Sequence, residues 1–72
     1  MGKYYFVYSV YAVTIDGEQE TAGMILDHAE LTDTISCFQA SGAAVSGVFV
    51  TMYDDQGNEV KTRDISHIVI NN

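Results

Sequence analysis

The chain has 72 residues, of which ten are Asp or Glu and three are Lys or Arg, so its formal net charge is −7. Hydrophobic residues make up 47% of it, which favours a folded protein over a disordered acidic tail. So few bases cannot neutralise many phosphates, which excludes direct nucleic-acid binding and disfavours an anionic membrane surface. One cysteine, Cys37, forms no intrachain disulfide, and no signal peptide is apparent. We expect residues 1–72 to be a single small cytoplasmic domain.

The first part of the chain predicts a β-hairpin. The segment from Tyr4 to Ile15 is rich in Tyr, Val, Phe and Ile, which prefer strands. Both of its alternating faces are mainly apolar, as in a central strand with a second packing surface. Asp16-Gly17 marks a tight turn, and Glu18 to Ile25 returns as a second strand that Gly23 weakens.

A helix is predicted next, over residues 28–41. Asp27 is a suitable N-cap, with Glu30 in the reach-back position of a capping box; a later start at Thr32 is the alternative, because Thr32 and Asp33 are also good caps. Apolar residues then recur at helical spacing and form one stripe, which consists of Leu31, Ile35 and Phe38. Gly42 is a reasonable C-terminal stop.

The remainder of the chain predicts two further strands. Val45 to Tyr53 is the third, and residues 54–58 form a turn. Glu59 to Arg63 then leads into Ile65 to Ile70, where alternating apolar residues predict that the last strand continues. The order β-β-α-β-β indicates an α+β fold: a small antiparallel sheet of about four strands with one helix packed on one face.

No motif indicates catalysis, a metal or a cofactor. His28, His67 and Cys37 lack the paired spacing of metal ligands, and the turn at 54–59 lacks the alternating oxygen ligands of a calcium loop. The glycines of residues 42–47 follow a helix and enter a strand, the reverse of a phosphate-binding loop. Cys37 and His28 would lie about 180° apart on a helix, which leaves Cys37 with His67 as the one catalytic pair. A chain of this size has little room for a closed cleft, so we expect no enzyme, metal or cofactor.

The acids and the tyrosines are the candidate functional residues. Nine carboxylates fall into three groups, one at each predicted turn and one at the helix start: Asp16, Glu18 and Glu20; Asp27, Glu30 and Asp33; Asp54, Asp55 and Glu59. If the fold gathers them on one side, they form a binding surface for a basic protein; if it scatters them, acidity serves solubility. Tyrosine rings with polar tips suit a contact surface, here formed by Tyr4, Tyr5, Tyr8, Tyr11 and Tyr53.

Two functions follow from these residues. In size and charge the chain resembles the small acidic proteins that viruses and bacteria use to block nucleic-acid-handling enzymes or toxins, although no family motif assigns roles to its residues. The resemblance implies a non-enzymatic protein whose carboxylate-rich surface docks on a basic partner, as an inhibitor or nucleic-acid mimic. The alternative is a structural homodimer joined through the tyrosine-rich strand, in which acidity only maintains solubility.

Overall fold

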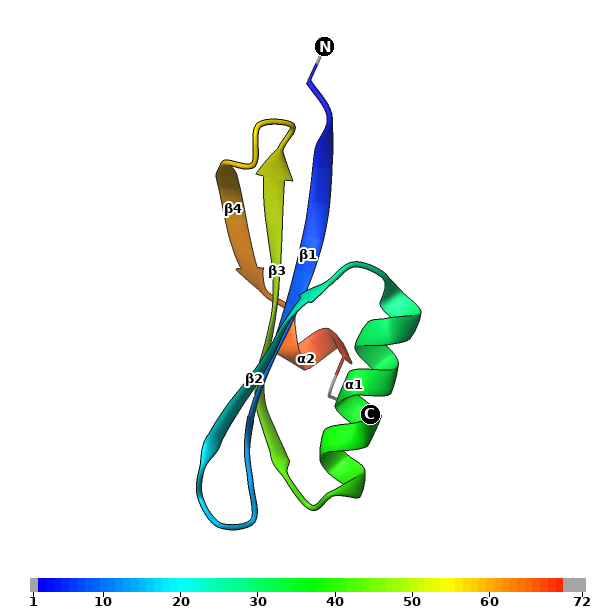
Figure 1. The fold of residues 1–72 in the computed structure, drawn as a ribbon, viewed down its shortest axis with the longest axis vertical. Helices are drawn as coiled ribbons and strands as arrows, with labels where there is room; N and C mark the ends of the chain where they lie inside the picture. Colours follow the sequence, from blue (N-terminus) through cyan, green and yellow to red (C-terminus); the bar gives the residue numbers. More distant parts are fainter. Residues whose placement is uncertain (1, 70–72) are drawn as a thin grey trace.

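One antiparallel sheet and two helices make up the computed structural model, which describes residues 2–69. The elements are β1 (Tyr4–Val13), β2 (Gln19–Ile25), α1 (His28–Ala40), β3 (Ala44–Asp54), β4 (Glu59–Asp64) and α2 (Ser66–Val69). The strands are arranged in the order β2-β1-β3-β4 (Figure 1). The α+β fold predicted from the sequence is confirmed, and β1 is a central strand as its apolar faces predict.

Alternation along β1 separates two faces of the sheet. Its even-numbered residues lie on the side covered by α1, the helix face, where Val10 pairs with Val48 and both are fully buried against Leu31. The odd-numbered residues lie on the opposite side, the open face, which neither α1 nor α2 covers. The core cluster lies between the sheet and α1 and is completed by Ile25 and Ile35. Val7, an odd-numbered residue, is also buried, on the open face.

Both ends of α1 have the capping chemistry that the sequence predicts. The Asp27 carboxylate accepts the backbone N–H of Glu30 at 2.7 Å, which satisfies one of the free donors of the first turn. At the other end Gly42 adopts φ +86°, and the Gly42 and Ala43 amides donate to carbonyls of the last turn. This is a Schellman motif, which requires a residue that tolerates left-handed backbone. The helix ends at Ala40, one residue before the predicted end.

The two predicted hairpin turns are present and lie at opposite ends of the molecule. Gly17 in the β1–β2 turn has φ +85° and Gly57 in the β3–β4 turn has φ +84°, conformations that favour glycine. The molecule measures 46 × 23 × 17 Å, and the turns are found at the two ends of its long axis (Figure 1).

The prediction that the last strand continues through Ile65 to Ile70 is wrong within the described residues. The strand ends at Asp64, and Ser66–Val69 forms the short helix α2. The Asp64 carboxylate accepts both the N–H and the hydroxyl of Ser66, at 2.8 and 2.6 Å, and this local bonding starts a helical turn. Val69 packs against the core. Residue 70 lies outside the described residues.

A bulge in β2 shortens its pairing with β1. Tyr8 pairs with Ile25 and Val10 with Ala22, so two residues of β2, one of them Met24, lie opposite one residue of β1. Met24 adopts φ +58°, a left-handed conformation that is unusual for a residue other than glycine. Bulges bend a strand, and beyond this one the chain turns away from β1 toward α1 (Figure 1). The N-terminal part of β1, which is uppermost in Figure 1, is thereby left without β2 beside it.

Candidate functional site

The N-terminal part of β1 is a strand edge that has a neighbouring strand on one side only. Its pairing with β3 extends from Tyr4, opposite Asp54, to Val13, whereas its pairing with β2 begins at Tyr8. Within residues 2–69, the stretch Tyr4–Val7 is therefore bonded to β3 alone. We call this stretch the open edge. Unpaired edges are templates for the addition of another strand.

The hydrogen-bonding pattern shows which residues of the open edge offer free backbone groups. The Thr14 amide donates to the Glu18 carbonyl at 2.8 Å, so Thr14 points its backbone groups toward β2. Because direction alternates along an antiparallel strand, the other even-numbered residues of β1 also point to that side. The N–H and C=O groups of Tyr4 and Phe6 consequently point outward, while those of Tyr5 and Val7 face β3.

Aromatic side chains flank the open edge on both faces of the sheet. Phe6 lies on the helix face, and 52% of its surface is exposed. On the open face the Tyr5 ring stacks on Tyr53 with centroids 5.6 Å apart, whereas Tyr4, which is also exposed, lies on the helix face with Phe6. A strand that adds to this edge would cover these rings, and such burial accompanies strand addition in protein recognition.

The five predicted tyrosines do not form one surface. Tyr5, Tyr11 and Tyr53 lie on the open face, where Tyr11 makes an edge-to-face contact with Phe49 at 5.5 Å. Tyr8 instead lies on the helix face and packs against the core. The open face therefore carries two aromatic pairs that leave Tyr5 and Tyr11 partly exposed to solvent.

The nine predicted carboxylates are likewise divided. Asp16 and Glu18 belong to the β1–β2 turn, and Asp54, Asp55 and Glu59 to the β3–β4 turn at the opposite end of the long axis (Figure 1). The acids of the helix start only partly join those of the β1–β2 turn. Glu30 and Asp33 line one hollow between β2 and α1 with Glu20, and Cys37 and Phe38 also line it. The fold thus does not gather all nine into one patch.

Several of these acids hold local structure. Asp54 accepts the backbone N–H groups of Asn58 and Gln56 at 2.8 and 2.9 Å, and the bond from Asn58 contributes most to lowering the pKa of Asp54 below its ordinary value. The Ser66 hydroxyl, followed by the Ser66 amide, lowers the pKa of Asp64 in the same way. Both carboxylates are ionised at neutral pH, so they act as turn caps and as surface charge together.

An acid lies near each end of this stretch of β1, but the two are on opposite sides of the strand. Asp54 is the register partner of Tyr4, and Asp55 follows it. At the other end Ile25 pairs with Tyr8, and Asp27 follows two residues later at the start of α1. A strand lying along the open edge would therefore approach Asp27, whereas Asp54 lies across β1 on β3 and bonds within the β3–β4 turn.

The residues considered for catalysis are divided between the two helices. Cys37 is exposed on α1 and lines the hollow with the acids, His28 begins α1, and His67 lies on α2. Among residues 2–69 there is no cluster of three or more side chains able to hold a metal ion. Neither helix in that range is long and apolar enough to cross a membrane.

Two features of the structure were not predicted from the sequence. Lys61 and Arg63 lie in the predicted last strand without an assigned role, yet they line a hollow with Phe6 on the helix face. The open edge was hidden because it depends on the bulge at Met24, and the one available signal was Gly23 within an otherwise apolar strand. Comparison with protein-family models, with curated proteins and with solved structures finds no match to this chain.

Proposed function

We propose that this chain is a non-enzymatic protein-binding module that receives a β-strand of a basic partner along the open edge of β1. The observation that carries the proposal is the stretch Tyr4–Val7, which is paired with β3 but not with β2. Its outward N–H groups can donate hydrogen bonds to the carbonyls of an extended backbone, and its outward C=O groups can accept hydrogen bonds from that backbone's amides. The exposed rings of Tyr4, Tyr5 and Phe6 supply apolar area beside those bonds.

Charge supports a basic partner. The chain carries −7 overall, and Asp27 lies on the side of β1 that an added strand would occupy, although Lys61 and Arg63 border Phe6 on the helix face. Lysines or arginines on an incoming strand would be attracted over distances of about 8–10 Å at physiological salt. Because the nine carboxylates are divided among separate places, we favour the strand edge, rather than one carboxylate-lined surface, as the main docking feature.

The test is a titration with a defined strand-forming probe. A fluorescein-labelled peptide that alternates valine and lysine should raise its fluorescence anisotropy saturably when the protein is added. Its affinity should fall when NaCl is raised from about 20 to about 500 mM, because exposed charges are then screened. A peptide with glutamate in place of lysine should bind more weakly.

Two controls separate strand addition from simple charge attraction. The same lysine peptide with alternate backbone nitrogens methylated keeps its charge but cannot bond along an edge, and it should not bind. Phe6→Pro removes an outward amide from the protein, and it should weaken binding of the unmodified peptide more than Phe6→Ala does. Equal binding of the methylated and unmethylated peptides would refute strand addition.

A homodimer is the second candidate, favoured by the aromatic pairs of the open face. Tyr5 and Tyr11 are 46% and 42% exposed there, and neither α1 nor α2 covers them. A second copy could bury these rings, although two chains of charge −7 repel each other at low salt. Light scattering after size exclusion, at several concentrations and at low and high salt, should show a dimer that salt strengthens. A monomer throughout would remove this candidate.

A further inference from the structure

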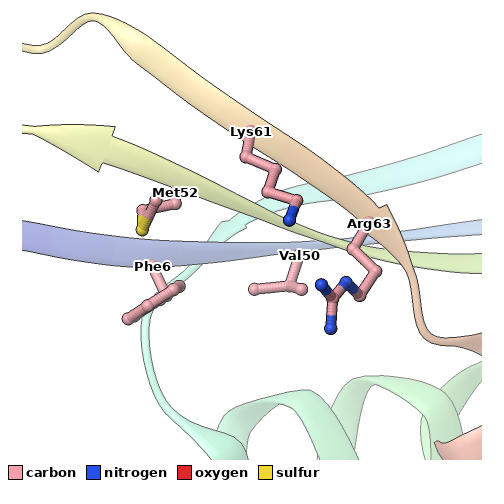
Figure 2. A pocket seen from close by; sticks show the side chains of 5 residues that line it. All are labelled: Phe6, Val50, Met52, Lys61 and Arg63. Atoms are coloured by element: carbon pink, nitrogen blue, oxygen red, sulfur yellow. The ribbon is translucent and has the colours of Figure 1, made fainter.

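A hollow on the helix face lies beyond the N-terminal end of α1 and has both apolar and cationic walls. It measures about 290 Å³ and is lined by residues of three adjacent strands: Phe6, Val50, Met52, Lys61 and Arg63. Figure 2 shows Val50 at its centre, Phe6 and Met52 on one side, and the nitrogen atoms of Lys61 and Arg63 directed toward it from β4.

The sheet register explains why these side chains converge. Lys61 pairs with Met52 and Arg63 with Val50, so both bases lie on the helix face, next to apolar neighbours. Phe6 pairs with Met52 from the other side and completes the row. Two of the three Lys and Arg residues of a chain with ten acids thus border one hollow.

The plain structural explanation of the two bases is incomplete. Charged residues on an edge strand such as β4 prevent unwanted pairing, and their aliphatic stems can cover apolar surface. Covering is only partial here, because Phe6 is 52% exposed and a hollow is left open above Val50. An apolar floor beside two cations is complementary to a ligand with an apolar body and one anionic group.

We propose that this hollow binds a small amphiphilic carboxylate. Its apolar body lies against Phe6, Val50 and Met52, and its carboxylate lies between the Lys61 ammonium and the Arg63 guanidinium, whose planar fork suits a carboxylate. The volume limits the ligand to the small end of the range for protein pockets, about 300–1,000 Å³. Two cations are too few for a duplex nucleic acid. The site shares the Phe6 side chain with the proposed strand docking, but it uses no backbone group of the open edge, so the two proposals are tested separately.

The test is an NMR titration of the full chain with octanoate as the probe. Amide shifts of residues near the hollow should change saturably with octanoate, and not with acetate, octanol or octylamine. Lys61→Gln and Arg63→Gln should each weaken octanoate binding by about 10-fold or more, as expected for loss of one charged hydrogen bond. Lys3→Gln removes the same charge outside the hollow. At physiological salt, which screens distant charges, it should leave octanoate affinity within about 2-fold of that of the unsubstituted chain.

Each contrary outcome identifies the error. No saturable change with octanoate, or an equal change with octylamine or octanol, would overturn the proposed ligand class. Equal weakening by Lys3→Gln would assign the effect to net charge and overturn the site. Saturable binding of acetate as tight as that of octanoate would overturn the role of the apolar floor. All three substituted positions are exposed, and circular dichroism confirms that each variant is folded before titration.

Discussion

Proline substitution at two adjacent positions of β1 should have unequal consequences for stability. The alternation of backbone direction places the Tyr5 amide toward β3, opposite Tyr53, and the Phe6 amide toward the open edge. Proline removes the amide hydrogen in both cases. Only at Tyr5 does that removal break a bond of the β1–β3 ladder.

The magnitude follows from the bond that is lost. Removing one partner of a backbone hydrogen bond costs about 1–3 kcal/mol when the other partner is left unsatisfied. Relative to Tyr5→Ala, we therefore expect Tyr5→Pro to lower the free energy of unfolding by about 2 kcal/mol. Relative to Phe6→Ala, Phe6→Pro should change it by less than about 1 kcal/mol, because proline is tolerated where the amide faces solvent and also restricts the unfolded chain. The alanine variants remove the side-chain contribution from each comparison.

Urea unfolding followed by far-ultraviolet circular dichroism measures these differences. A domain of 72 residues has a free energy of unfolding of about 4–11 kcal/mol, so a loss of about 2 kcal/mol is resolved and leaves most of the chain folded. In thermal unfolding the same loss corresponds to about 8–16 °C. Equal proline effects at the two positions, or a larger effect at Phe6, would refute the assignment of the open edge.

Three further predictions concern the core, the turns and the bulge. Leu31→Ala should lower the free energy of unfolding by about 2–5 kcal/mol in urea titrations, because Leu31 is 1% exposed in the centre of the core; a loss below about 1 kcal/mol would contradict the packing of α1. The pKa values of Asp54 and Asp64 are lowered in the folded chain, so their stabilising effect is complete above the ordinary aspartate pKa of about 3.9 and is lost as pH falls through the folded values. Stability measured between about pH 6 and pH 2 should therefore fall less steeply in the Asp54→Asn and Asp64→Asn variants, and an unchanged slope would contradict these assignments. Met24→Gly should raise the free energy of unfolding by about 0.5–1 kcal/mol, since glycine relieves the left-handed backbone at φ +58° and the Met24 side chain is 73% exposed; a loss of stability would contradict this account.

The parts of the fold that depend on local chemistry could be predicted from the sequence. Asp27 and Gly42 bound the helix because a side-chain acceptor and a left-handed residue are required at fixed positions around α1. Gly17 and Gly57 mark turns for the same kind of reason. These signals lie within a few residues of the structure they specify.

Other parts depend on contacts between distant segments and could not be predicted. Ile65 to Ile70 alternates like a strand, but Ser66 bonds both to Asp64 and to the backbone of Val48 on β3, which fixes a helical turn there. The division of the acids follows from the opposite directions of the two hairpins. The open edge follows from the bulge at Met24, which only the pairing register reveals.

Hydrogen exchange at individual amides of β1 tests the proposed strand addition most directly. In the free protein the Tyr5 and Val7 amides should exchange slowly, whereas the Tyr4 and Phe6 amides should exchange near the rate of an unprotected chain. Addition of the valine–lysine peptide should slow exchange at Tyr4 and Phe6 and leave Tyr5 and Val7 unchanged. Peptide binding that leaves the Tyr4 and Phe6 amides unprotected would contradict the proposal that the open edge receives a partner's strand.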